Sequence, residues 1–280
     1  MFRIAEKTAL NPSVVRLSVE APRIARKALP GQFVILRAGA NSERIPLTVA
    51  GVDKGAGTVT VIFQIAGAGT MELSALNAGD CLRDFVGPLG RPSELDGLKK
   101  VAVVGGGVGC AIALPVARGL KEKGTVVHSI VGFRSKDLVI LEEEFAGCSD
   151  LLKVMTDDGS YGEQGLVTTA LEALIQSGEQ YDEIIAIGPL VMMKFVTQVA
   201  KQYGIKVVVS MNPIMIDGTG MCGGCRLTVG GETKFACVDG PEFDGTLVDF
   251  DEAIHRNAMY REFEAHAREE SCNLFQQEVK

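Results

Sequence analysis

The chain has 280 residues, a net charge of −7 and 46% hydrophobic residues, and it contains no tryptophan. This length supports a large core and more than one domain. The acidic balance and the few aromatic side chains argue against a nucleic-acid partner, because phosphate backbones attract basic surfaces. No uncharged apolar run reaches the roughly 18 residues that a membrane span needs, and the N-terminus does not read as a signal peptide. We therefore expect a cytoplasmic protein without a membrane partner.

The first 98 residues are expected to form a barrel. Short β-rich runs at 14–19, 32–36 and 59–65 are separated by glycine, proline and asparagine, and helical periodicity is almost absent. Several such strands close together indicate a small antiparallel β-barrel.

Two segments of this barrel have the chemistry of a flavin site. Residues 44–48 read Arg-Ile-Pro-Leu-Thr, which places a guanidinium for a diphosphate and a hydroxyl for a flavin ring nitrogen on one strand. Residues 67–70 form a glycine-lined turn before a short helix, whose N-terminus attracts anions. Each segment alone also reads as a surface arginine or an ordinary turn. Together, on neighbouring strands, they favour a bound flavin diphosphate.

The pattern changes at residue 99, where strands begin to alternate with helices. Such alternation is typical of a doubly wound parallel sheet, so we expect an α/β Rossmann-like domain over 99–210. Pro115 falls inside the first helix of this domain and should kink it. Strands are predicted at 101–104, 126–131, 152–155, 184–187 and 207–209, and helices at 167–176 and 191–203.

Three turns that follow strands of this sheet are predicted to bind a nucleotide. The first, Gly-Gly-Gly-Val-Gly at 105–109, opens a helix, although Cys110 breaks the G-x-G-x-x-G spacing. The second offers the carboxylates of Asp157 and Asp158 to ribose hydroxyls. The third, Gly188-Pro189, should lie at the same carboxyl edge, where open sheets bind ligands. Tight or solvated turns without a ligand are the alternative interpretation.

The nucleotide is expected to be NAD(H). Acidic Asp157 and Asp158 near the ribose site favour it. Arg134 and Lys136, after the second strand, could instead hold the 2′-phosphate of NADP(H).

A possible metal site follows the sheet. Asp217, Cys222, Cys225 and Cys237 have the spacing of a plant-type [2Fe-2S] ligand run, C-x4-C-x2-C…C, with aspartate in the first position. Glycines around the cysteines let backbone N–H groups approach inorganic sulfide. A zinc site with Asp217 or His255 as the fourth ligand, and a C-x-x-C redox pair, are the competing hypotheses.

This segment predicts a cluster module over 211–250 with a hairpin turn at 229–232, followed by a helix over 251–280. An odd number of unevenly spaced cysteines suits a metal site in a reducing compartment better than a disulfide framework. The remaining cysteines and two histidines are expected to be structural: Cys81, Cys110, Cys148, Cys272, His128 and His266.

Taken in chain order, these motifs resemble those of ferredoxin–NADP reductase-like proteins, and the resemblance covers nearly the whole chain. It implies an FAD-binding barrel over 1–98, an NAD(P)-binding domain over 99–210 and a [2Fe-2S] module that passes electrons to a partner. The motifs are Pro-Gly-Gln-Phe at 30–33, the runs at 44–48 and 69–70, Gly-Pro-Leu-Gly at 87–90, the loop at 105–109 and the cysteine segment.

The resemblance also assigns residues. Arg44 is expected to contact the FAD diphosphate and Thr48 to lie near flavin N5, while Asp217 and the three cysteines are the metal ligands. No side chain is expected to act as acid or base, because hydride transfer from nicotinamide and single-electron transfer to the cluster are centred on the flavin. The implied cofactor-binding residues are Arg44, Ile45, Pro46, Leu47, Thr48, Gln64, Ile65, Gly69, Thr70, Gly105, Gly107, Val108, Gly109, Arg134, Asp157, Asp158, Gly188 and Pro189.

The chain resembles two kinds of electron-transfer subunit in this family. That of NAD-dependent dihydroorotate dehydrogenase carries four cysteines around its cluster. The small subunit of NADH-dependent reduced ferredoxin:NADP oxidoreductase resembles this chain in having one aspartate and three cysteines, so Asp217 favours it.

This assignment implies an oxidoreductase subunit in a heterodimer. Its larger partner would hold a second FAD and [4Fe-4S] clusters, and the complex would couple NADH, NADPH and ferredoxin by electron bifurcation. The alternatives are a dihydroorotate dehydrogenase subunit, a sulfide dehydrogenase or other NAD(P)H–acceptor reductase, and a zinc-containing scaffold protein.

Overall fold

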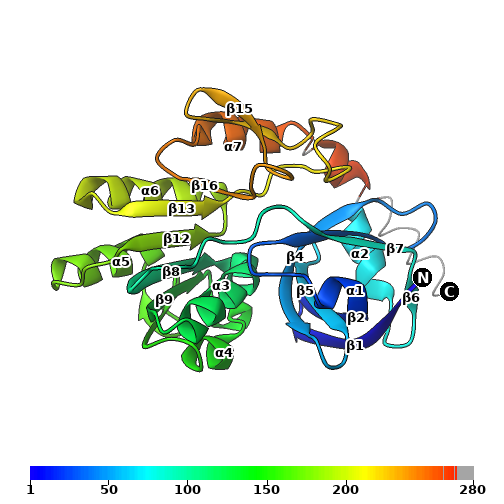
Figure 1. The fold of residues 1–280 in the computed structure, drawn as a ribbon, viewed down its shortest axis with the longest axis horizontal. Coiled ribbons are helices and arrows are strands. Elements are labelled where there is room, and N and C mark those ends of the chain that lie inside the picture. The colour runs from blue at the N-terminus through cyan, green and yellow to red at the C-terminus, as the bar shows by residue number, and fades with distance from the viewer. Residues whose placement is uncertain (261, 268, 270–280) are drawn as a thin grey trace.

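The protein is represented by a computed structural model that describes residues 1–260, 262–267 and 269. In the described part, a nearly closed barrel and a seven-stranded sheet lie side by side, and the chain that follows the sheet crosses over both (Figure 1). This arrangement confirms the predicted combination of an antiparallel barrel with a parallel sheet.

The barrel is antiparallel throughout, in the order β6-β1-β2-β5-β4-β3-β7. Alternation along its strands sends every second side chain inward, so Leu17 and Val19 are fully buried while Ser18 between them is not. Its strands are β1 (Phe2–Asn11), β2 (Val14–Glu20), β3 (Phe33–Arg37), β4 (Ile45–Asp53), β5 (Thr58–Gln64), β6 (Cys81–Leu82) and β7 (Asp84–Leu89), with helices α1 (Pro22–Ala25) and α2 (Ala68–Ala75).

The second sheet has the order β11-β10-β9-β8-β12-β13-β16. Its first six strands are parallel, and the central ones, β8, β9 and β12, are nearly continuous apolar runs that are almost entirely buried. Its strands are β8 (Lys100–Gly106), β9 (Val126–Phe133), β10 (Leu151–Thr156), β11 (Glu163–Gln164), β12 (Glu183–Ile187), β13 (Lys206–Ser210) and β16 (Glu242–Asp244). Its helical segments are η1 (Gly107–Gly109), α3 (Cys110–Glu122), η2 (Lys136–Leu138), α4 (Glu142–Ala146), α5 (Val167–Gln176) and α6 (Leu190–Tyr203).

The seventh strand, β16, differs from the prediction of an entirely parallel sheet. It comes from the segment after Cys237 and pairs antiparallel with β13, with Glu242 opposite Ser210. Its three residues carry too little periodicity to be recognised in the sequence. Consequently, the end of the predicted cluster module is joined to the nucleotide-domain sheet by backbone hydrogen bonds.

Between β13 and β16 lies the predicted hairpin, β14 (Arg226–Val229) and β15 (Glu232–Phe235), and after β16 comes α7 (Phe250–Ala258). The helix predicted over 251–280 thus begins one residue earlier, and α7 ends at Ala258. The end of the predicted helix and Cys272 lie outside the described residues. α3 continues through Pro115, which is buried within it.

One hydrophobic core joins all three parts of the chain. It contains Phe33 and Ile35 from the barrel, strands β8, β12 and β13 of the sheet, and Cys225 and Cys237 from the cysteine segment. Because these residues are buried against each other, the two cysteines have a fixed position relative to the barrel.

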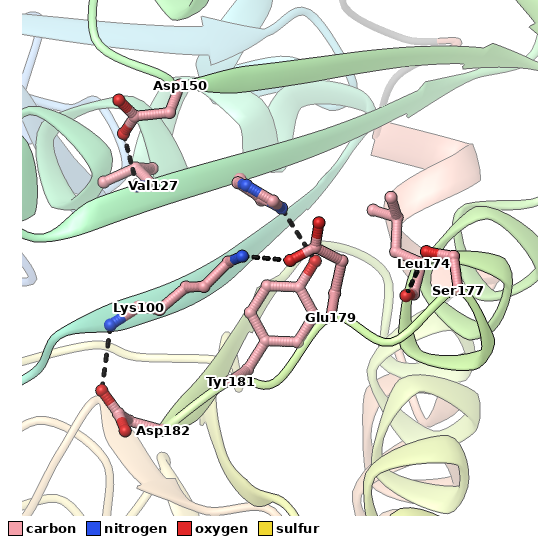
Figure 2. Close-up of polar contacts among 9 residues, drawn as sticks. Lys100, Val127, Asp150, Leu174, Ser177, Glu179, Tyr181 and Asp182 are labelled. Carbon is pink, nitrogen blue, oxygen red and sulfur yellow. Dashed lines mark hydrogen bonds and ion pairs between the residues drawn. The ribbon is translucent and has the colours of Figure 1, made fainter.

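The amino edge of the sheet is closed by a polar network (Figure 2). His128 is buried, and its Nδ1 lies 2.9 Å from the hydroxyl of Tyr181. Lys100 forms an ion pair with Glu179, and its Nζ lies 5.7 Å from the centroid of the Tyr181 ring. Asp182 accepts a hydrogen bond of 2.9 Å from the backbone N–H of Lys100. Among the described residues, no helix is long and apolar enough to cross a membrane.

Candidate functional site

A cleft of about 710 Å³ opens where the barrel, the carboxyl edge of the sheet and the chain after β13 meet. The parallel strands end here, so the turns that follow them face the barrel across the cleft. Ten of the predicted cofactor-binding residues line it: Pro46, Thr48, Gln64, Gly107, Val108, Gly109, Arg134, Asp157, Gly188 and Pro189.

The glycine loop after β8 allows a ligand to approach the backbone closely. Gly107 has a φ of 55°, and a Cβ there would meet nothing within 4 Å. A Cβ on Gly109 would lie 2.6 Å from the carbonyl oxygen of Ile187 and 2.7 Å from Cα of Gly188. The two glycine turns are therefore in direct contact, and residues 107–109, which line the cleft, lead directly into α3. These features fit a diphosphate.

Gly105 has a different role from its neighbours. It does not line the cleft, and a Cβ there would lie 2.9 Å from Sγ of the buried Cys110. The residue permits β8 to pack on α3.

The two neighbouring carboxylates after β10 face different ways. Asp157 lines the cleft together with Arg134. Asp158 instead accepts hydrogen bonds from the hydroxyl and the backbone N–H of Ser160, at 2.6 and 2.9 Å, and these bonds lower its pKa. Lys136 is also engaged locally, with its Nζ 5.6 Å from the centroid of the Tyr161 ring. Of the two aspartates predicted for the ribose, only Asp157 lines the cleft.

Strand alternation divides the predicted flavin segment in two. Pro46 and Thr48 of β4 line the cleft, whereas Ile45 and Leu47 pack against the core of the barrel. The same division separates Gln64, which lines the cleft, from Ile65, which packs on the barrel core.

Three further predicted residues lie on the barrel but outside the cleft. Thr70 closes the first turn of α2, since its Oγ1 accepts hydrogen bonds from the N–H groups of Ala66 and Gly67 at 2.9 and 3.0 Å. A Cβ on Gly69 would lie 2.5 Å from a carboxylate oxygen of Glu43. Glu43 therefore has to move for a phosphate to reach this helix start. Arg44 donates from Nε to the carbonyl oxygen of Ile216 at 3.1 Å.

The first member of the cysteine segment, Asp217, organises its own loop. Its two carboxylate oxygens accept hydrogen bonds from the N–H groups of Thr219 and Cys222, at 2.9 and 2.8 Å. These donors, Thr219 first, lower the pKa of Asp217. Each oxygen retains a second lone pair, so a hydrogen-bonded carboxylate is still able to bind iron.

Backbone N–H groups also approach the cysteine sulfurs. Gly224 donates to Sγ of Cys222 and Cys237 donates to Sγ of Cys225, both at 3.4 Å. Burial raises the pKa of Cys237 to about 12, so an electropositive metal is needed to hold a thiolate there. Three thiols, a carboxylate and N–H groups directed at sulfur fit a [2Fe-2S] cluster.

Cys225 and Cys237 are buried, while Cys222 is exposed. In the described part of the chain, no three His, Cys, Asp or Glu side chains converge on one point as ligands of a single ion.

The sequence prediction missed one wall of the cleft. Residues 210–213, Met215 and Pro241 line it on the side of the cysteine segment. Because residue 210 ends β13, the rule that ligands bind at the carboxyl ends of strands would have pointed to the residues that follow it.

Comparison with known proteins places these features in a family. Residues 212–249 match the iron-sulfur cluster binding domain of dihydroorotate dehydrogenase B. A dihydroorotate dehydrogenase B (NAD(+)) electron transfer subunit homolog from Thermotoga maritima is 47% identical over 261 residues, covering 93% of this chain and 92% of the relative. The corresponding electron transfer subunit of Streptococcus pneumoniae R6 is 36% identical over 257 residues, covering 88% of this chain and 97% of its own.

A solved structure of an NADH-dependent reduced ferredoxin-NADP oxidoreductase, described for flavin-based electron bifurcation, has the same fold. Its TM-score is 0.91 at 43% identity, covering 100% of this chain and 98% of that chain. The chain therefore belongs to the family of dihydroorotate dehydrogenase B electron transfer subunits and their homologues, which are oxidoreductase subunits that use FAD, a [2Fe-2S] cluster and NAD(P)H, as the sequence predicted.

Proposed function

We propose that this chain transfers electrons between NAD(H) and a larger partner subunit, through FAD and a [2Fe-2S] cluster, in an electron-bifurcating NADH/ferredoxin/NADP oxidoreductase. The observation that carries the proposal is the ligand set of Asp217 with three cysteines, in which a carboxylate replaces one thiolate. The 43% identity to the reduced ferredoxin-NADP oxidoreductase, over 98% of that chain, supports it.

The barrel side of the cleft is proposed to hold the flavin. Thr48 and Gln64 offer polar groups to its ring system beside Pro46, while Arg44 and the start of α2 serve the diphosphate. A flavin held by these residues would supply the chemistry of hydride acceptance and single-electron transfer. The protein supplies orientation, and no side chain of the cleft needs to transfer a proton.

The sheet side of the cleft is proposed to hold NAD(H). The turn at Gly107 and the N-terminus of α3 bind the diphosphate, and Gly188 and Pro189 form the floor on which the nicotinamide half lies. Asp157 accepts hydrogen bonds from the ribose. This arrangement directs the nicotinamide toward the barrel.

The hydrophobic core shared by the barrel and the cysteine segment is proposed as the route for electrons from the flavin to the cluster. Phe33 lines the cleft and belongs to the same buried core as Cys225 and Cys237, so this core connects the proposed flavin site with two of the proposed cluster ligands. Cys222 is exposed, and its neighbour Met221 is 88% exposed, so the proposed cluster would have one face toward a partner.

A second candidate function is electron transfer to dihydroorotate dehydrogenase itself. The match of residues 212–249 to the cluster domain of that enzyme favours it. Both functions require the same cofactors in this chain, and they differ in the partner.

Isolation of the complex distinguishes the two. An affinity-tagged chain purified from its native cell is expected to bring a larger subunit containing FAD and [4Fe-4S] clusters, and the complex should couple NAD(H), NADP(H) and ferredoxin. A complex that oxidises dihydroorotate with NAD and lacks [4Fe-4S] clusters would establish the second function instead.

The ligand set is tested by Asp217→Cys. A thiolate is a softer ligand than a carboxylate, so the variant should assemble a cluster with a shifted midpoint potential. The measurement is a redox titration followed by electron paramagnetic resonance. A midpoint identical to that of the wild type would argue against iron ligation by Asp217.

A further inference from the structure

Two arginines of the barrel contact the cysteine segment at its two ends. Arg44, directly before β4, donates from Nε to the carbonyl oxygen of Ile216 at 3.1 Å. Arg91, two residues after β7, donates from Nε to the carbonyl oxygen of Val238, also at 3.1 Å. Ile216 directly precedes Asp217 in the chain, and Val238 directly follows Cys237.

These contacts hold the outer members of the ligand set. Asp217 is the first and Cys237 the last of the four residues proposed to bind the cluster. Each therefore has a neighbouring carbonyl group fixed by a guanidinium of the barrel, although 172 and 147 residues separate the partners in the chain.

The segment is close to the barrel between these two points. Gly218 has a φ of 72°, and a Cβ there would lie 2.5 Å from Cδ1 of Ile35 in β3 and 3.1 Å from Cδ1 of Leu89 in β7. The backbone N–H of Arg91 donates to the carbonyl of Gly240 at 2.7 Å. The loop thus rests directly on the barrel strands, and a small shift of either arginine changes the position of the ligands.

The two guanidinium groups have different surroundings. Arg91 has an acidic neighbour, since its terminal nitrogen lies 3.9 Å from a carboxylate oxygen of Asp239. Of the three guanidinium nitrogens of Arg44, Nε alone forms a hydrogen bond with a described residue, so the two terminal nitrogens can bind an anion on the barrel. A guanidinium remains charged at every physiological pH, and both therefore place positive charge beside the segment.

We propose that Arg44 and Arg91 are positioning residues for electron transfer, which fix the cluster segment on the flavin-binding barrel and raise the reduction potential of the cluster. Arg44 joins the two cofactor sites physically, with Nε on the cluster loop and its terminal nitrogens on the flavin diphosphate. This inference rests on the proposed function, because it requires a cluster at Asp217 and the three cysteines.

The effect on potential has a simple electrostatic origin. Reduction adds one electron to the cluster, and a nearby positive charge favours the reduced form. Loss of one partly solvated charge should lower the ratio of reduced to oxidised cluster roughly tenfold, which corresponds to about 59 mV for one electron.

The test compares Arg44→Gln and Arg91→Gln with Arg26→Gln. Arg26 is a matched control, because its Nε also donates to a backbone carbonyl, that of Pro22 at 3.2 Å, but directly after α1 on the barrel. Iron, sulfide and FAD are measured per chain, and the cluster midpoint is measured by a redox titration followed by electron paramagnetic resonance. We expect both test variants to have lower midpoints or to lose the cluster, while Arg26→Gln matches the wild type.

Arg91 separates this inference from the flavin assignment, because it is not among the proposed flavin ligands. A lowered midpoint in Arg91→Gln with a full complement of FAD supports a direct effect on the cluster. Arg91→Lys keeps the charge and loses the Nε donor, so its cluster midpoint should lie between those of the wild type and Arg91→Gln. Midpoints and iron contents equal to those of Arg26→Gln in both test variants would overturn the inference. Absence of a [2Fe-2S] signal in the wild type would instead overturn the proposed function.

Discussion

The two edges of the nucleotide-domain sheet are built in opposite ways. At the carboxyl edge, glycine turns and apolar side chains surround an open cleft, and polar groups such as Asp157 and Arg134 face it. At the amino edge, polar side chains satisfy one another: His128 with Tyr181, and Lys100 with Glu179 (Figure 2).

The difference shows how function can be separated from stability within one sheet. A polar group whose partner lies in the protein stabilises the fold, whereas a polar group facing a cleft is available for a ligand. Substitutions at the carboxyl edge should therefore change nucleotide binding, and substitutions at the amino edge should change the free energy of unfolding alone.

The largest effect is expected for Gly109→Ala. The new Cβ would lie 2.6 Å from the carbonyl oxygen of Ile187, so the glycine loop and the end of β12 must separate. We expect a loss of about 2 kcal/mol in the free energy of unfolding, and at least tenfold weaker binding of NADH. Chemical denaturation and fluorescence titration measure the two quantities.

Gly51→Ala is the control for this substitution. Gly51 lies in β4, and a Cβ there would have its nearest contact at 3.8 Å, from the side chain of Thr60. If both variants bind NADH equally well, the contact between the two glycine turns has no role in nucleotide binding.

The same comparison explains what the sequence could predict. Periodicity identified helix α5 with its exact bounds, Val167–Gln176, because its apolar positions repeat at helical spacing and a strand precedes it. The rule for carboxyl edges located Gly107, Asp157 and Gly188 in one cleft.

The failures have local physical causes. The sequence does not distinguish Asp157 from Asp158, because only the structure shows that Ser160 occupies the second carboxylate. Likewise, Ile45 and Leu47 belong to a motif that suggests cofactor contact, yet strand alternation directs them into the barrel core. β16 is held by hydrogen bonds to its neighbour β13, which lies more than 30 residues earlier in the chain, and no short-range sequence pattern reveals this pairing.

The next effect in size is expected at the amino edge, for Tyr181→Phe. Without the hydroxyl, Nδ1 of the buried His128 loses its partner, which should cost about 1–2 kcal/mol of stability. Binding of NADH should not change, because the network lies at the far edge of the sheet. Tyr203→Phe is the control, since its hydroxyl bonds with Gln176 and Glu172 on a surface where water can replace it. A change in NADH affinity in Tyr181→Phe would show that the two edges are coupled.

A smaller effect is expected from the pair Asp157→Ser and Asp158→Ser. The carboxylate of Asp157 lines the cleft and should repel the 2′-phosphate of NADPH, whereas that of Asp158 is held by Ser160. Removing the first should improve the affinity for NADPH relative to NADH by roughly fivefold, or about 1 kcal/mol. Titration of both variants with both nucleotides gives the ratio. An equal change of the NADPH/NADH affinity ratio in the two variants would mean that both aspartates contribute to the ribose site.

The smallest effect concerns pH, and each edge contributes one group of opposite sign. Burial, followed by the positive charge of Lys100, lowers the pKa of His128, while Glu179 and Asp150 oppose this shift. The unfolded chain then binds more protons than the folded one, so this group stabilises the fold above pH 6.5, and its contribution falls as the pH drops below that value.

At the carboxyl edge the sign reverses. Burial raises the pKa of Glu242 to about 7, against a hydrogen bond from Ser93 and with repulsion from Glu183 and Glu94. The folded state holds this proton more tightly, so stability falls as the pH rises from about 4.5 to about 7. Between pH 5 and pH 6.5 the two groups give slopes of opposite sign, each at most about 1.4 kcal/mol per pH unit, which offset each other in the wild type.

Single substitutions expose each slope. In His128→Gln the contribution of Glu242 remains, so the free energy of unfolding should fall as the pH rises through this range. In Glu242→Gln the contribution of His128 remains, and the free energy of unfolding should rise. Urea denaturation at half-unit intervals of pH measures both. Slopes of the same sign in the two variants would mean that the two edges do not carry opposing protons, and that another group governs the pH response.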